Sequence, residues 1–145
     1  LSADDAIFCA ARSTPSTLCE TATLPCATSC RLRLMSDVAW RCSRTAEAIT
    51  VAFPGLGGIL PGYGSQRPND WGLGFELRDG KSPHWTGVNN SARTFGHFGQ
   101  AGTFIWVDPA AELALVVLTS RDFGDWAHPL WPAISDGVLR EFGAH

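Results

Sequence analysis

Lysine is nearly missing from this sequence. Lys81 is the only one among 145 residues, and arginine supplies the rest of the positive charge. The chain has 11 basic and 14 acidic side chains, a net charge of −3, and no basic run. Proteins that bind nucleic acids or anionic membrane surfaces carry clustered positive charge. We therefore expect neither kind of partner for this chain.

A long apolar run and a signal peptide are also missing. No uncharged apolar run approaches the roughly 20 residues that a membrane-spanning helix needs. The opening LSADDAIFCAARS has acidic residues where a secretory signal peptide is basic. The sequence thus gives no indication of export or of a membrane segment, which favours a cytoplasmic location.

The cysteines form no recognisable framework. All five lie in the first third of the chain: Cys9, Cys19, Cys26, Cys30 and Cys42. An odd number argues against a closed set of disulfides. The pair Cys26-x-x-x-Cys30 has no second pair, and no His-x-x-x-His, to complete a zinc site. We expect free thiols in a reducing compartment, with no metal and no cofactor.

The character of the chain changes near residue 45. Residues 1–45 mix Ser, Thr, Cys, Arg and Pro without a sustained period of 2 or 3.6 residues. This predicts a poorly ordered or divergent segment and, within residues 13–44, no element longer than a turn or two. An out-of-frame translation of GC-rich DNA and genuine divergence would both give this composition, and both remain open. Residues 46–145 are predicted to form one folded lobe.

Within the lobe, turn residues and alternating residues mark the first elements. Five glycines and three prolines between Phe53 and Asp70 predict one long surface loop. The alternation in WGLGFELR predicts a half-buried strand over residues 71–78. Its buried face would hold Trp71, Leu73, Phe75 and Leu77.

The last 45 residues predict a hairpin followed by a helix. TFIWVDP and ELALVVLTS are strand-like, and DPAAE between them has the composition of a turn. A helix is predicted to end at Gly143 with Pro132 in its first turn. Its apolar residues are spaced by four: Leu130, Ile134, Val138 and Phe142. We predict an α+β fold, an antiparallel sheet of about four strands with the C-terminal helix packed on one face.

The most unusual segment precedes the hairpin. TFGHFGQAG, residues 94–102, has His97 between two glycines and a third glycine soon after. Each glycine in a strand loses side-chain packing and costs backbone entropy. We therefore expect a ligand or another backbone to lie close to this segment, at the edge of the sheet.

These motifs resemble the serine hydrolases that include class C beta-lactamases, D-alanyl-D-alanine peptidases and family VIII-type esterases. Members carry a third active-site box, lysine-threonine-glycine in the lactamases and often histidine-x-glycine in esterase-like members. HFG at His97–Gly99 is similar to that box. FPGL and WGLGFELR before it, and the hairpin and helix after it, follow the family's order. The resemblance covers roughly Ala46 to the C-terminus.

The resemblance implies roles for three residues. His97 would contact the substrate or the catalytic tyrosine, Gly99 would admit the substrate backbone, and the N–H of Gln100 would face the oxyanion. Histidine in place of lysine implies a preference for esters over beta-lactams. The expected partner is a small ester or amide substrate.

The nucleophile motif of this family is absent. S-x-x-K cannot occur, because the residue three before Lys81 is Arg78. Tyr63-Gly64-Ser65 matches the second box, Y-x-S, but the family has its tyrosine much earlier, in a helical subdomain. We interpret the chain as a fragment or divergent member of this serine hydrolase family that is inactive alone. A non-catalytic ligand-binding module and a vestigial structural fragment are the alternatives.

Two further expectations concern an edge and a histidine. In the family, strands from the N-terminal part of the full chain pair beside the last hairpin strand. Residues 112–120 would then be an unpaired apolar edge, and such edges recruit other strands. We expect self-association through residues 112–120 unless the first 45 residues cover them. His84 is expected to be a satisfied or solvent-facing histidine rather than a catalytic one.

Overall fold

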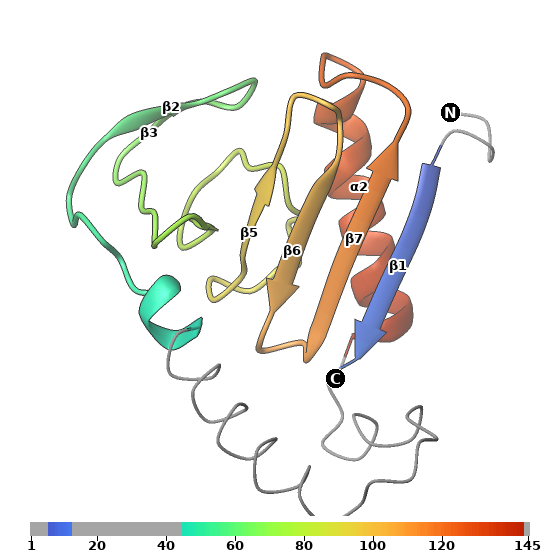
Figure 1. Cartoon of the computed structure of the whole chain (residues 1–145), viewed down its shortest axis with the longest axis horizontal. Coiled ribbons are helices and arrows are strands. Elements are labelled where there is room, and N and C mark those ends of the chain that lie inside the picture. The colour runs from blue at the N-terminus through green and yellow to red at the C-terminus, as the bar shows by residue number, and fades with distance from the viewer. Residues whose placement is uncertain (1–5, 13–44, 144–145) are drawn as a thin grey trace, which may run out of the picture.

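The computed structural model describes residues 6–12 and 45–143. A five-stranded antiparallel sheet lies at its centre, in the order β1-β7-β6-β5-β4, with helix α2 across one face (Figure 1). This confirms the predicted α+β fold with a C-terminal helix. The elements are β1 (Ala6–Arg12), β2 (Gly58–Leu60), β3 (Gly64–Gln66), β4 (Glu76–Leu77), β5 (Phe95–Phe98), β6 (Phe104–Asp108), β7 (Leu113–Thr119) and α2 (Ala127–Phe142). No helix in the described ranges is long and apolar enough to cross a membrane.

The predicted hairpin is confirmed as β6 and β7. The side chain of Asp108 stabilises the turn between the two strands. The Asp108 carboxylate accepts hydrogen bonds from the backbone N–H groups of Ala110 and Ala111, at 3.0 and 3.3 Å. It also accepts the backbone N–H and the hydroxyl of Ser91, at 2.7 and 2.6 Å. Burial alone would raise the pKa of Asp108, but these hydrogen bonds lower it. An ionised carboxylate therefore ties the loop at Ser91 to the hairpin.

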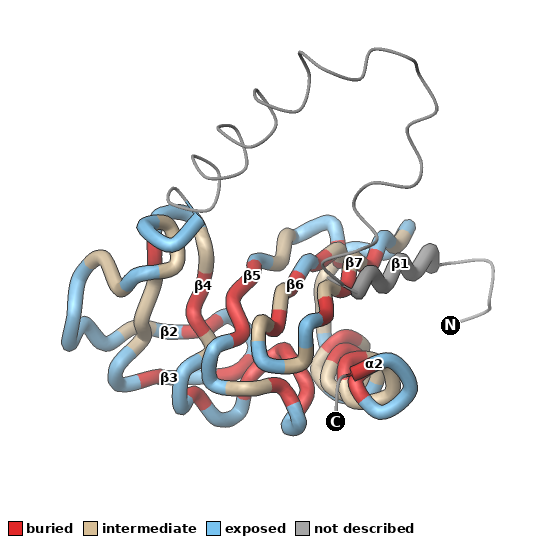
Figure 2. Tube along the Cα trace, turned by 90° about the horizontal axis from the view of Figure 1, so that it is seen from below, coloured by how far each residue is buried: buried red, intermediate tan, exposed pale blue. Residues whose placement is uncertain are grey.

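The core lies between the sheet and α2, where buried residues gather (Figure 2). Helix α2 buries Ala127, Trp131, Ser135 and Leu139. The predicted stripe of Leu130, Ile134, Val138 and Phe142 is therefore one position off, and Phe142 is 47% exposed. Trp131 determines which face of α2 is buried, because its ring packs on that of Phe104 with 5.0 Å between the ring centroids. Pro132 lies inside the helix rather than in its first turn.

The strand predicted over residues 71–78 is wrong in extent. Only Glu76 and Leu77 pair with β5, and the chain folds back on itself so that Trp71 bridges Glu76. Gly74 has a φ of +87°, and a Cβ on Gly72 would collide with the backbone of Ala48. These two glycines allow the chain to turn. The alternating pattern of WGLGFELR gave no indication of this turn.

The loop predicted between Phe53 and Asp70 contains a short hairpin. Strands β2 and β3 pair antiparallel, with Ile59 opposite Ser65. Leu60 and Tyr63 are buried beside the main core. The hairpin therefore anchors a segment for which the sequence predicted only surface loop.

The edge expected at residues 112–120 is not open. β1 pairs with β7 along its whole length, from Ala6 opposite Thr119 to Arg12 opposite Leu113 (Figure 1). The prediction of an unpaired edge at residues 112–120 was therefore wrong. Residues 13–44 lie outside the described part, so their predicted poor order stays a prediction. Self-association through residues 112–120 now depends on whether β1 stays in place.

We predict that deleting residues 1–12 will produce dimers or larger species. Without β1, a seven-residue apolar strand would present unpaired backbone groups, which recruit other strands. Multi-angle light scattering should show a larger mean mass for the truncated chain than for the full chain. Deleting residues 1–5 alone is the control and should leave the mass unchanged. An unchanged mass for both variants would contradict the role given to β1.

Candidate active site

The predicted site residues lie at the end of β5 and in the turn that follows. β5 pairs with β6 over four residues but with β4 only at Phe95 and Gly96, so His97 lies beyond the last pair with β4. The next side chain, Phe98, packs on Trp131 of α2, so His97 points to the opposite face of the sheet. The His97 ring is exposed and stands edge-on to Trp71, with 5.6 Å between ring centroids.

The three glycines around His97 have different reasons to be glycine. A Cβ on Gly96 would collide with the backbone of Ile105 in the neighbouring strand. Gly102 has a φ of +70°, and a Cβ there would collide with the backbone of Arg121. A Cβ on Gly99 would lie 3.9 Å from the hydroxyl of Thr103, an ordinary contact. The fold therefore requires glycine at 96 and 102 but not at 99.

The turn after β5 leaves the backbone N–H groups of Gln100 and Ala101 without an acceptor among the described residues. The N–H of Gly99 donates to the carbonyl of Thr103 at 2.9 Å, and the N–H of Gly102 donates to the carbonyl of Gly99 at 3.0 Å. The carbonyl of Gln100 accepts the N–H of Phe123 at 2.8 Å. The N–H of Gln100 has no acceptor among the described residues. The turn thus holds an available donor three residues after His97.

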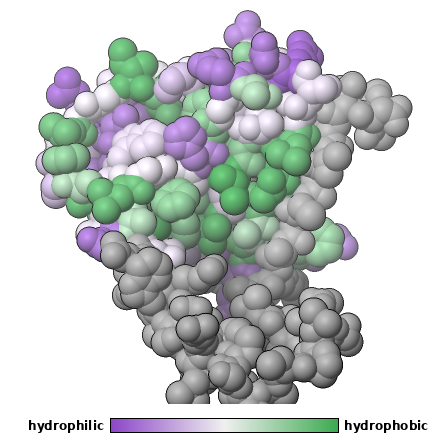
Figure 3. Space-filling view, viewed as in Figure 1, coloured by the Kyte–Doolittle hydropathy of each residue, from purple (hydrophilic) through white to green (hydrophobic). Residues whose placement is uncertain are grey.

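His97 and Gly99 share a hollow of about 380 Å³ on the sheet face away from α2, the face seen in Figure 3. Most of its walls come from β5 and the β6–β7 hairpin. The lining residues are His97, Phe98, Gly99, Thr103, Phe104, Ile105, Val116 and Leu118. Gln100 does not line it. The structure therefore brings two of the three predicted site residues to one mainly apolar hollow.

The structure does not bring the Tyr63–Ser65 motif to His97. Tyr63 lines a different hollow, of about 210 Å³, together with Lys81 and His84. Its ring packs on His128 with 5.2 Å between centroids, and its hydroxyl is buried without a hydrogen-bond partner in the described part of the chain. Burial raises the pKa of Tyr63 well above its usual range. A tyrosine in this state is a poor general base.

Lys81 is fully engaged in a buried network around Glu76. Its ammonium group donates to the carbonyls of Asp70 and Leu77, at 2.8 and 2.7 Å, and to Glu76 Oε1 at 3.1 Å. Trp85 donates to the other carboxylate oxygen of Glu76 at 2.7 Å. Three ammonium hydrogens meet three acceptors. The one lysine of the chain is therefore structural. All three of its ammonium hydrogens are engaged, so none is available for a hydrogen bond to a nucleophile.

His84 completes this network as a neutral ring. Its Nδ1 accepts the backbone N–H of Thr86 at 3.2 Å, so Nε2 carries the hydrogen and donates to Glu76 Oε1 at 3.2 Å. Burial lowers the pKa of His84, and the bond to Glu76 opposes that shift. The expectation of a satisfied histidine is confirmed. No sequence motif marked this network, because its members meet only when β4 and the loop after it fold together.

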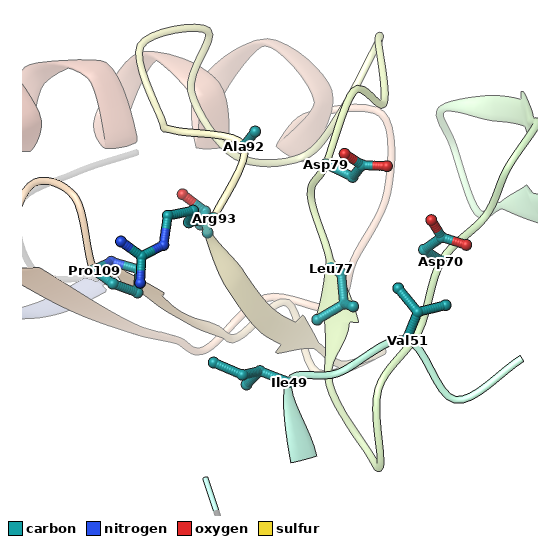
Figure 4. A pocket seen from close by; sticks show the side chains of 9 residues that line it. Ile49, Val51, Asp70, Leu77, Asp79, Ala92, Arg93 and Pro109 are labelled. Carbon is teal, nitrogen blue, oxygen red and sulfur yellow. The ribbon is translucent and has the colours of Figure 1, made fainter. Parts of the chain in front are cut away.

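A third hollow, of about 230 Å³, lies apart from the predicted site residues (Figure 4). The carboxylates of Asp70 and Asp79 and the guanidinium of Arg93 stand around an apolar floor that includes Leu77. Within the described ranges, no group of three or more His, Cys, Asp or Glu side chains could hold a metal ion. This hollow therefore adds no catalytic group to His97.

Comparison with known proteins decides the family. The model of the Beta-lactamase family matches residues 56–137, more than half of the chain. This chain belongs to the beta-lactamase family. The match includes β2 to β7 and the first part of α2, and it confirms the resemblance drawn from the HFG segment and the hairpin after it.

The sequence of a beta-lactamase from Mycobacterium bovis, known from a crystal structure, is 74% identical to this chain over the matched part, and the two structures match with a TM-score of 0.68. The match covers 70% of the present chain and 38% of the Mycobacterium bovis chain. The chain thus spans less than half the length of this relative. No curated protein matches.

We predict that Glu76→Gln will destabilise this beta-lactamase-family lobe by about 3–5 kcal/mol, because it leaves the buried ammonium of Lys81 without its counter-charge. Urea denaturation monitored by tryptophan fluorescence would measure the change in the free energy of unfolding. Glu47→Gln, at an exposed position, is the matched control. A loss below 1 kcal/mol would contradict this role for Glu76.

The same network should make the fold sensitive to acid. Burial alone would raise the pKa of Glu76, but its bond from His84 and the charge of Lys81 lower it. Folding lowers the pKa of His84 as well. The stability from both groups is present above their unfolded values and lost as the pH falls, from about 6.5 downward. Glu76 contributes to the loss only below its unfolded pKa of about 4.3, so the Glu76→Gln variant should show a shallower loss of stability below that pH.

Proposed function

We propose that this chain is the lobe of a beta-lactamase-family acyl hydrolase that carries the third active-site box, His97-Phe98-Gly99. In a complete site it would act on small esters. The observation that supports this most strongly is that position 99 is a glycine. Neither its φ nor its packing requires glycine, yet it lies beside an exposed histidine on the wall of a hollow.

Each residue of the segment has a chemical role in this proposal. Acyl transfer needs a nucleophile, a base, and donors placed where the oxyanion develops. His97 donates a hydrogen bond to the substrate or to the catalytic tyrosine. Gly99 lets the substrate backbone lie against the strand, and the free N–H of Gln100 faces the oxyanion.

The nucleophile and its base come from outside this chain. S-x-x-K is absent, and the ammonium of Lys81 has its three hydrogens occupied. Ser65 is exposed in β3, next to a buried tyrosine whose pKa is raised. A non-catalytic module that binds ligands in the His97 hollow is the second candidate, favoured by the largely apolar walls of that hollow.

We predict that the 145-residue chain alone is inert. Hydrolysis of short-chain nitrophenyl esters and of a chromogenic cephalosporin should not exceed that of a His97→Ala control, because the sequence has no S-x-x-K motif to activate a serine. A fluorophosphonate probe should label no serine. A stoichiometric burst that vanishes in Ser65→Ala would overturn the proposal and make Tyr63–Ser65 part of a complete site.

The proposal also predicts activity once the site is completed. In one chain that joins this protein to the uncovered part of the Mycobacterium bovis beta-lactamase, esters should be hydrolysed. His97→Ala should lower kcat/KM by about 10²–10³, the usual effect of losing one donor. Gly99→Ala should also lower kcat/KM while leaving the melting temperature unchanged, because its Cβ meets only ordinary contacts.

Gly124→Ala is the matched control for Gly99→Ala. A Cβ on Gly124 would also meet only ordinary contacts, the nearest at 3.7 Å on Trp126. Both variants should fold equally well, and only Gly99→Ala should lose activity. Equal activity of the two variants would rule out a substrate passing against Gly99.

A further inference from the structure

The imidazole ring of His97 is oriented by packing and not by a hydrogen bond. Within the described ranges, neither of its ring nitrogens has a hydrogen-bond partner. The ring stands against that of Trp71, with 5.6 Å between centroids and 72° between the ring planes. The ring of Phe98 is farther away, at 6.5 Å. A functional histidine is commonly oriented by a hydrogen bond to its second nitrogen. Here the contact with Trp71 stands in place of that bond.

Trp71 reaches His97 from the side on which β4 stops. β4 pairs Glu76 with Gly96, so one more pair would set Phe75 opposite His97. The chain turns before Glu76 instead, and Trp71 forms a bridge to Glu76. A side chain therefore stands beside His97 where a continued β4 would have placed a paired strand.

The backbone that carries Trp71 is fixed on both sides. The carbonyl of Trp71 accepts the N–H of Ala52 at 2.8 Å. The carbonyl of Asp70, the preceding residue, accepts the ammonium group of Lys81, also at 2.8 Å. Lys81 is in turn bound to the buried carboxylate of Glu76. The buried ion pair thus holds the segment from which the indole reaches His97.

Trp71 and the hollow lie on different sides of His97. The hollow is lined by residues of β5, β6 and β7 and by the turn after β5, and Trp71 is not among them. Ile105, which pairs with His97 across β5 and β6, does line it. An exposed side chain samples several staggered rotamers, and a bulky neighbour on one side excludes those that would turn the ring into it. Trp71 therefore restricts the imidazole to orientations that face the hollow.

We propose that Trp71 is a positioning residue for His97. It acts through the imidazole and not on the reacting atoms, by keeping a ring nitrogen directed at the hollow before a substrate arrives. A group that is oriented in advance lowers the barrier, because its freedom is not lost during the reaction. The orienting of His97 stands on the packing alone, and its effect on catalysis rests on the proposed function.

Nuclear magnetic resonance on the full 145-residue chain tests the orienting contact without any activity. The ring protons of His97 are assigned by their loss in His97→Ala. In the unchanged chain, a nuclear Overhauser effect should join the ring protons of His97 and Trp71. Trp71→Leu should move the His97 ring resonances toward those of a free histidine, because the ring current of the indole is lost. Trp71→Phe keeps an aromatic ring and should retain most of the displacement.

Trp126→Leu is the matched control. Trp126 is also half-buried, and it stands edge-on to Trp131 of α2, on the opposite side of the sheet from His97. Its loss should leave the His97 ring resonances unchanged. Absence of the Overhauser effect would overturn the proposal, and this measurement needs no variant to fold. Identical His97 resonances in Trp71→Leu and in the unchanged chain would overturn it as well.

The effect on catalysis is measured in the single chain that joins this protein to the uncovered part of the Mycobacterium bovis beta-lactamase. Trp71→Leu should lower kcat for ester hydrolysis by roughly 10–10²-fold with KM nearly unchanged, and Trp71→Phe should restore most of kcat. In a His97→Ala background, Trp71→Leu should have no further effect, because no imidazole is left to orient. Trp126→Leu should leave kcat unchanged.

The kinetic outcomes separate the positioning role from the proposed function. An equal fall in both backgrounds would overturn the positioning role, because Trp71 would then act independently of His97. A raised KM at constant kcat would also overturn it, because Trp71 would then bind the substrate itself. A joined chain that hydrolyses no ester, while both resonance effects are present, would contradict the proposed acyl hydrolase and still support the orienting of His97 by Trp71.

Discussion

The buried carboxylate of Glu76 is the constraint on which the geometry around His97 depends. A fully buried ionised group is tolerated only when its hydrogen-bonding capacity is met, here by Lys81, His84 and Trp85. Meeting it holds Glu76 opposite Gly96, and the chain just before Glu76 turns at Gly72 and Gly74 so that Trp71 bridges Glu76. Phe75, which the register would place opposite His97, therefore lies in this turn, and β5 is unpaired by β4 at His97, which leaves that end of the strand open to a ligand.

Sequence periodicity predicted correctly those parts of the fold that local sequence alone determines. The β6–β7 hairpin followed from two strand-like runs around a turn, and it forms as predicted. For the helix, the residues Ala127, Trp131, Ser135 and Leu139 repeat every four positions, as does the predicted stripe beside them. Spacing alone does not distinguish these two stripes. The choice depends on where Trp131 fits among the aromatic rings of the core, which is a tertiary property.

The sequence indicated that backbone comes close to the glycines around His97, but not which of those glycines the fold requires. The density of glycines around His97 correctly indicated close backbone approaches at Gly96 and Gly102. Those approaches come from Ile105 and Arg121 of the same chain, and only Gly99 has space beside it that the fold does not need. The pairing of β1 with β7 joins segments far apart in the sequence, and the Glu76 network forms only when β4 and the loop after it fold together. No local pattern encodes such contacts, so the sequence did not predict them.

The edge of the hairpin and its face away from α2 need different kinds of partner. At the edge, β1 supplies the backbone partners that β7 needs, and any strand of suitable length satisfies that requirement because the ladder is made of main-chain groups. The face of β6 and β7 that points away from α2 needs side-chain complementarity, which one added strand beside β7 does not give to Ile105 or Val116. Among the described residues, β1 therefore covers the edge while Ile105, the pairing partner of His97, stays 42% exposed.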